Sequence, residues 1–295
     1  MDLFIFALVY GPLWLLTWLP LPVLYLLSDF LAFLMWNIVP YRKNLVIRNL
    51  SRSFPGREQS EIKKIARRNI LHFCDSFIES VAALHMSDKE MKKRYRFKNM
   101  ELLEKLHSEG RDILMMAGHY ANWEWFSLIQ EFTSYRVLAV YKTLNNKYFD
   151  KLFIKLRSKF GLLPVSRTET LRTIIQYMRE GKRFVLYSLA DQRPRGIQIQ
   201  HWITFMNQDT PVVLGPEKIA RKYNMPVLFY NISRVTRGHY ECELNLLEEN
   251  PSSTQSPEIT ERYYKVLEQC ITAHPEYYLW THNRWKYKRD GRFSG

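Results

Sequence analysis

Short apolar runs alternate with amphipathic stretches from about residue 111 onward. The apolar runs predict strands at 113–117, 136–141, 184–190 and 227–233. The stretches between them predict helices at 122–132, 146–160, 168–181 and 214–224. Residues 239–246 alternate with period two, as in a half-exposed strand, and a last helix is expected at 258–273. This order favours an α/β domain over residues 111–295, with a mixed, largely parallel sheet flanked by helices.

A different pattern occupies residues 1–40, where the stretch 3–28 has no charged side chain. Such a stretch is long enough to cross a hydrocarbon core of about 30 Å at about 1.5 Å per residue. We therefore predict an N-terminal membrane-anchoring helix. Because Pro12, Pro20 and Pro22 interrupt it, a re-entrant or half-buried helix is the alternative to a single span. A cleavable signal peptide is disfavoured, since no basic residue precedes the apolar run.

Residues 41–110 form a basic amphipathic and helical segment that follows the anchor. The first cations of the chain are here, at Arg42, Lys43, Arg48 and Arg52, and apolar positions at helical spacing predict a helix over 58–90. By the positive-inside rule, this cluster places the remainder of the chain on the cytoplasmic face of the membrane.

The formal net charge of +14 narrows the range of partners. A basic chain is attracted to an anionic membrane surface, a phosphorylated lipid, an acidic protein or nucleic acid. The apolar anchor favours a membrane over nucleic acid, which we do not expect to be bound. The three cysteines are far apart, and no His, Cys or Asp cluster has metal-ligand spacing, so neither a disulfide framework nor a metal site is predicted.

Three histidines are followed five positions later by an acid: His85 and Glu90, His107 and Asp112, His119 and Glu124. Only His119 follows a predicted strand, where an α/β sheet delivers ligand-binding loops. If Gly118 allows a sharp turn and Glu124 begins the next helix, the carboxylate can orient the imidazole and stabilise its protonated form. A catalytic pair is one interpretation. The other is a loop histidine with a local hydrogen bond.

Several stretches, in order, resemble the lipid A biosynthesis (late) acyltransferase family, the lauroyl and myristoyl transferases. They are YRKNLVIRNLSRSFP (41–55), MAGHYANWEW (116–125), VYKTLNN (140–146), LADQ (189–192), FMNQDTPVVLGPEKIARKYNMPVLF (205–229) and HPEYYLWTHNRWK (274–286). The second stretch has the strand–Gly–His–x4–acid pattern of glycerolipid acyltransferases, with Glu124 where many members have Asp. The resemblance spans nearly the whole chain and implies a fold of the glycerolipid-acyltransferase type.

The resemblance also implies a reaction. A fatty acyl chain moves from a thioester, acyl carrier protein or acyl-CoA, to a hydroxyl of an anionic membrane lipid, a lipid A precursor, without a bound cofactor or metal. His119 would be the general base, with Glu124 as its partner. No Gly-x-Ser-x-Gly nucleophile elbow is present, so direct transfer without a covalent intermediate is expected. The implied location is the cell inner membrane.

Further substrate-binding positions follow from the same comparison and from the strand ends. Arg157 falls where the family has an arginine and is the expected oxyanion donor. Asp191 and Gln192 end a predicted strand and are assigned to acceptor binding or support of the site. The remaining candidates for substrate binding are Tyr141, Lys142, Asn145, Asn122 and Trp123. Acceptors left open are an aminoacyl lipid, a glycolipid and a lysophospholipid.

Overall fold

The computed structural model describes every residue except 1, 195, 197–198 and 290–295. Seven strands form one sheet in the order β1–β9–β8–β2–β5–β3–β4. Their bounds are β1 Tyr95–Lys98, β2 Ile113–Ala117, β3 Arg136–Tyr141, β4 Leu163–Ser166, β5 Phe184–Leu189, β8 Val227–Thr236 and β9 His239–Glu248. Strands β8, β2, β5, β3 and β4 are parallel, and β9 is antiparallel to β8. The predicted mixed, largely parallel sheet is confirmed.

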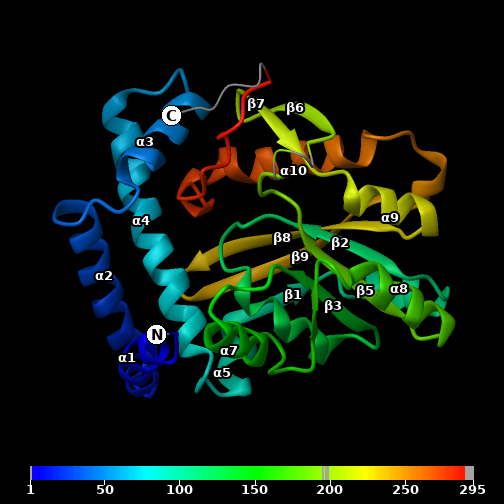
Figure 1. The fold of residues 1–295 in the computed structure, drawn as a ribbon, viewed down its shortest axis with the longest axis horizontal. Coiled ribbons are helices and arrows are strands. Elements are labelled where there is room, and N and C mark those ends of the chain that lie inside the picture. The colour runs from blue at the N-terminus through cyan, green and yellow to red at the C-terminus, as the bar shows by residue number, and fades with distance from the viewer. Residues whose placement is uncertain (1, 195, 197–198, 290–295) are drawn as a thin grey trace.

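Helices surround the sheet, as the alternating pattern predicts (Figure 1). They are α1 Asp2–Leu16, α2 Leu21–Asn37, α3 Lys43–Ser53, α4 Gln59–Ala82, α5 Asp88–Arg94, α6 Glu101–Ser108, α7 Lys147–Arg157, α8 Thr170–Arg179, α9 Gly215–Tyr223 and α10 Glu258–Ala273. Helices α1 to α4 gather at one side of the sheet in Figure 1. The stretch predicted as helix at 122–132 is a 3₁₀ helix, η1 Glu124–Phe132.

The apolar N-terminal stretch forms two helices, with a break at residues 17–20. Proline at position 20 explains the break, because it has no N–H to donate and disfavours helical backbone at Leu19. Within the described residues, no helix is both long and apolar enough to cross a membrane. The expected single spanning helix is therefore not found among the described residues, where the apolar stretch is divided into α1 and α2.

One face of α2 packs on α4, while apolar side chains on the other face are exposed. The buried residues of α2 are Leu21, Leu24, Tyr25, Ser28 and Ala32. Most of the large exposed apolar side chains of the described chain lie between residues 3 and 39. Among them, Leu8, Leu15 and Leu26 are 65–68% exposed.

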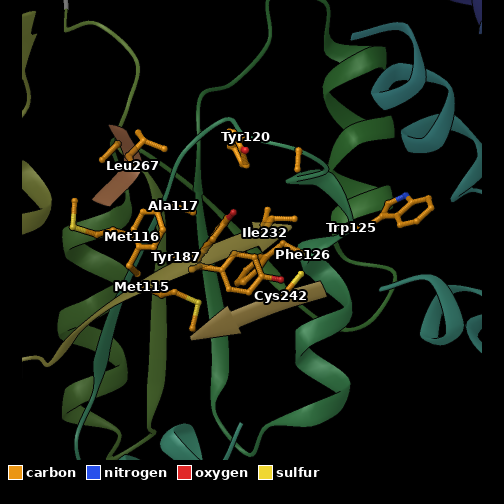
Figure 2. Packing of buried hydrophobic residues seen from close by; sticks show 14 of the residues in the cluster. Met115, Met116, Ala117, Tyr120, Trp125, Phe126, Tyr187, Ile232, Cys242 and Leu267 are labelled. Atoms are coloured by element: carbon orange, nitrogen blue, oxygen red, sulfur yellow. The ribbon is translucent and has the colours of Figure 1, made fainter. Parts of the chain in front are cut away.

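The core lies on both faces of the sheet, and β2 is buried along its whole length. The rings of Phe126 and Tyr187 stack with centroids 3.5 Å apart, and Figure 2 shows them near Ile232 and Cys242. Strands β6 His201–Phe205 and β7 Gln208–Val212 form a separate hairpin. Its two turn residues, Met206 and Asn207, both have positive φ, the geometry that suits a two-residue hairpin loop.

Candidate active site

The turn after β2 carries His119 and is held by the C-terminal segment. The His119 carbonyl accepts a hydrogen bond from the Leu279 amide at 3.1 Å, and the Ala121 amide donates to the Tyr277 carbonyl at 3.0 Å. Ala121 is the turn residue in the left-handed region, with φ of 51°. Gly118 does not have positive φ. A Cβ there would lie 2.6 Å from Leu267 Cδ1, so a side chain at this position would have to displace the end of the Leu267 side chain.

Asp191 is the carboxylate that holds His119. It follows β5, the strand beside β2, and is 2% exposed. Its Oδ1 lies 2.6 Å from His119 Nδ1, and its Oδ2 accepts the His119 backbone N–H at 3.1 Å. Burial alone would raise the pKa of Asp191, but the contacts with His119 outweigh burial and lower it. An ionised Asp191 fixes the imidazole proton on Nδ1.

The opposite ring nitrogen, Nε2, is left as an acceptor. Gln192 Nε2 lies 3.1 Å from His119 Nε2, a geometry in which the amide N–H donates to the ring. The Trp123 ring packs beside the imidazole, with centroids 5.2 Å apart. In the tautomer with its proton on Nδ1, His119 has Nε2 as an acceptor in a fixed orientation, which is what a general base requires.

Glu124 pairs with Arg157 rather than with His119. Arg157 Nη2 donates to Oε1 at 2.8 Å and Nε donates to Oε2 at 3.1 Å, a bidentate ion pair. Burial would raise the pKa of Glu124, but the Arg157 charge outweighs burial and lowers it. No hydrogen bond or ion pair joins Glu124 to His119 in the described part of the chain. We expected Glu124 to orient His119. Asp191, which follows the neighbouring strand β5, makes this contact instead.

His119, Trp123, Glu124 and Arg157 line one cavity of about 740 Å³. Its wall contains many apolar side chains, including Phe126, Ala139, Leu162 and Leu186. Tyr141, Lys142 and Gln192 also line this cavity, as the sequence predicted from strand ends. Asn145 is exposed and is not among the lining residues.

Asn122 is buried away from the cavity. Its Nδ2 donates to Glu79 Oε2 at 2.6 Å, and its Oδ1 accepts the Trp125 amide at 3.0 Å. Asn122 therefore does not have the expected position for a substrate contact. Its hydrogen bond with the Trp125 amide instead holds the start of η1.

The other two histidine–acid pairs have structural partners. His85 Nδ1 lies 2.5 Å from Thr17 Oγ1, and the His85 ring stacks on Trp18. The His107 ring packs edge-on against Tyr135. Asp112 accepts from the Phe184 amide at 3.2 Å. Neither His85 nor His107 lines the cavity that contains His119.

Three cations of the cavity wall were missed by sequence reasoning: Arg167, Arg193 and Lys218. Arg167 follows β4, a strand that the sequence did not predict. Lys142 was found because it follows a predicted strand, and Arg167 would have been found in the same way if β4 had been predicted. No group of His, Cys, Asp or Glu among the described residues has the geometry to bind a metal ion.

Known proteins resemble this chain over nearly its whole length. A sequence profile described as bacterial lipid A biosynthesis acyltransferase matches residues 1–287. The chain is 25% identical over 284 residues to a lipid A biosynthesis lauroyltransferase of Escherichia coli, covering 95% of this chain and 91% of the relative. It is 21% identical over 286 residues to a lipid A biosynthesis palmitoleoyltransferase of Escherichia coli, covering 96% and 92%. The chain thus belongs to the bacterial lipid A biosynthesis acyltransferase family and is an acyltransferase of lipid A biosynthesis.

Proposed function

We propose that the enzyme transfers a fatty acyl chain from a thioester, acyl carrier protein or coenzyme A, to a hydroxyl of an anionic lipid A precursor. The observation that carries this proposal is the orientation of His119. Its Nδ1 is held by Asp191 at 2.6 Å, and its side chain belongs to the wall of a cavity of about 740 Å³ lined by apolar and cationic side chains. The apolar side chains suit the acyl chain of the thioester, and the cationic side chains suit an anionic acceptor.

The mechanism begins with removal of a proton. His119 Nε2 accepts the proton of the acceptor hydroxyl as its oxygen attacks the thioester carbon, which gives a tetrahedral oxyanion. Asp191 stabilises the imidazolium that results. The intermediate collapses, the C–S bond breaks, and the leaving thiolate takes the proton from His119. One ester forms and one thiol is released.

Arg157 is the proposed donor to the oxyanion. Its contacts with Glu124 use Nε and one N–H of Nη2, so the guanidinium keeps further N–H groups for a substrate. Glu124 would then act by holding the fork of Arg157 in place. This assignment keeps Glu124 in the catalytic machinery but changes its partner.

Direct transfer without an acyl-enzyme is the simplest scheme for these residues. Cys74 and Cys242 are buried, and neither lines the cavity. Ser127 and Ser188 do line the cavity. Within the described chain, however, neither serine forms a hydrogen bond with His119, the contact that activates a serine nucleophile.

The proposed location is the inner membrane, with the α/β domain on the cytoplasmic face. Helices α1 and α2 would be embedded in one leaflet by their exposed apolar side chains. Helix α1 packs on α7, where the Phe6 ring lies 5.1 Å from that of Phe149. Since α7 also supplies Phe153 and Arg157 to the cavity, a lipid acceptor has a short path from the membrane to the site.

Acyl transfer by the purified full-length protein in detergent micelles tests the function. The donor is labelled acyl carrier protein, with acyl-CoA in a parallel assay, and the acceptor is a tetra-acylated lipid A precursor. The expected product is heavier than the acceptor by one acyl chain. Transfer to a lysophospholipid or a glycolipid, but not to the lipid A precursor, would overturn the proposed acceptor.

A further inference from the structure

Arg284 is a charged side chain that the proposed mechanism does not use. It lies in the C-terminal segment, is 1% exposed, and is the only buried lysine or arginine among the described residues. Its Nη2 donates to the Pro211 carbonyl at 2.8 Å and to the Tyr264 hydroxyl at 3.0 Å. The Nε and Nη1 groups are buried, with no hydrogen-bond acceptor in the described part of the chain. A buried cation without a paired anion is costly for folding, so packing alone does not account for an arginine at this position.

Hydrogen bonds connect this guanidinium to the strand end that carries Asp191. The Tyr264 hydroxyl accepts from Arg284 and donates to the Ala190 carbonyl at 2.9 Å. Ala190 directly precedes Asp191, which lies 2.6 Å from His119. Arg284 does not line the cavity. It therefore lies behind the Asp191–His119 pair, on the side of α10.

The charge of Arg284 acts on Asp191. Burial raises the pKa of Asp191, but His119 and then Arg284 lower it, and the lowering outweighs burial. Burial lowers the pKa of His282 to about 4, and Arg284 adds to this effect, so His282 is neutral near pH 7. Burial also raises the pKa values of the tyrosines around Asp191 on this side, which stay neutral: Tyr263, Tyr264 and Tyr278.

Other charged and titratable side chains lie near the pair on the side of the cavity. They are Glu124, Arg157, Tyr187 and Arg193. Glu124 is paired with Arg157, and burial raises the pKa of Tyr187. Arg193 is only partly buried. In the part of the chain that the structure describes, Arg284 is thus the cation on the buried side of Asp191.

We propose that Arg284 is a positioning residue for acyl transfer, whose buried guanidinium is the counter-charge of Asp191. This inference rests on the proposed function, because it assumes that His119 is the base. With Asp191 ionised, the His119 proton stays on Nδ1, and Nε2 is free to accept the proton of the acceptor hydroxyl. Without the charge of Arg284, the Asp191–His119 pair should take up a proton at higher pH, and Nε2 would no longer be an acceptor.

The pH dependence of kcat/KM tests this assignment. Arg284→Met removes the charge, Arg284→Gln removes the charge but keeps a donor, and Arg284→Lys keeps the charge. We expect the acidic limb of the profile to lie about half a pH unit or more above that of wild type in both neutral variants, with Arg284→Lys near wild type. Tyr264→Phe removes the hydrogen bonds but keeps the charge, and Arg262→Met removes an exposed charge of α10. Neither of these controls should move the limb.

Titration of the His119 side chain measures the same effect without acyl transfer. Protein with isotope-labelled histidine is titrated by NMR in detergent micelles, and the His119 signals are assigned by their loss in His119→Gln. In Arg284→Met and Arg284→Gln, the ring should take up its second proton about half a pH unit or more above wild type. Because the titration needs no substrate, it separates a failure of this proposal from a failure of the proposed function.

Three results would overturn the proposal. One is a folded neutral variant that titrates as wild type does, even if its activity is lower. Another is an equal shift in Tyr264→Phe, which would assign the effect to hydrogen bonding rather than to charge. The third is a folded Arg284→Lys protein with the same shift as the neutral variants.

Discussion

At the scale of single residues, His119 is fixed by contacts on both ring nitrogens. Asp191 holds Nδ1 and the backbone N–H, and Gln192 donates to Nε2. An acceptor hydroxyl must replace or share the Gln192 contact in order to reach the base. The geometry of the site therefore depends on two residues that follow β5 as much as on the turn after β2.

Asp191→Asn should lower kcat about 100-fold or more, because an amide can donate to Nδ1 and thereby place the proton on Nε2. Acyl transfer is measured beside the unfolding temperature, which controls for loss of structure. A kcat within about threefold of wild type in a folded Asp191→Asn protein would show that His119 does not depend on this carboxylate.

The Glu124–Arg157 pair is tested by a double-mutant cycle. If Glu124 acts by holding Arg157, Glu124→Gln and Arg157→Gln should each lower kcat about tenfold or more. The double variant should be little worse than the more damaging single one. Full additivity in kcat would instead mean that the two side chains act independently.

The sequence was sufficient to predict which residues lie near one another at this site. It was not sufficient to predict which of them form hydrogen bonds with each other. Strand ends brought His119, Lys142 and Gln192 to one edge, and all three line the cavity. The five-residue spacing suggested Glu124 as the partner of His119. The observed partner is 72 positions away along the chain, and that contact depends on β2 and β5 being neighbours, which local spacing does not encode.

At the scale of elements, long apolar runs predicted their strands closely, and short strands were missed. β1 is a four-residue strand with two cations, and β4 contains Pro164. Both lie at the edges of the sheet, where short, charged or proline-containing strands are tolerated. Strands of this kind lack the hydrophobic pattern from which the central ones were predicted.

Helices α1 and α2 should determine binding to membranes. Leu8, Leu15 and Leu26 are exposed, and each would contribute about 1.5–3 kcal/mol if it were fully buried in lipid. The triple variant with serine at these positions should lose most of its co-sedimentation with anionic vesicles. Leu171→Ser, an exposed leucine of α8, is the control. Equal sedimentation of the triple variant and wild type would exclude this pair of helices as the membrane-binding surface.

At the scale of the whole molecule, a buried network joins the N-terminal helices to the catalytic domain. Glu79 of α4 accepts hydrogen bonds from Tyr25 at 2.7 Å, Tyr240 at 2.8 Å and Asn122 at 2.6 Å. These partners come from α2, β9 and the turn before η1. Helix α2 is thus connected through one carboxyl group to the turn that carries Asn122.

Burial raises the pKa of Glu79 to about 7, which gives folding a pH dependence. This pKa is above the value of about 4.3 expected for a glutamate in the unfolded chain. Between about pH 4.3 and pH 7, Glu79 is therefore ionised in the unfolded state but still protonated in the folded state. Stability from this group is complete below about pH 4.3 and falls as pH rises through 7, by about 1.4 kcal/mol per pH unit at most.

Urea unfolding from pH 5 to pH 8 tests this dependence. The stability of wild type relative to Glu79→Gln should fall with rising pH, because the amide stays neutral throughout. Burial also lowers the pKa of His72 to about 3 and that of His282 to about 4, and the comparison removes these contributions because both proteins share them. Parallel stability curves for the two proteins would contradict the assignment.

The central claim is that His119 is the base for acyl transfer. The most direct test is the rate of single-turnover acyl transfer by His119→Ala, with His239→Ala of strand β9 as the matched control. We expect His119→Ala to unfold at the wild-type temperature and to transfer about 1000-fold more slowly or worse, with His239→Ala unaffected. Transfer by folded His119→Ala at a rate near that of wild type would contradict the account.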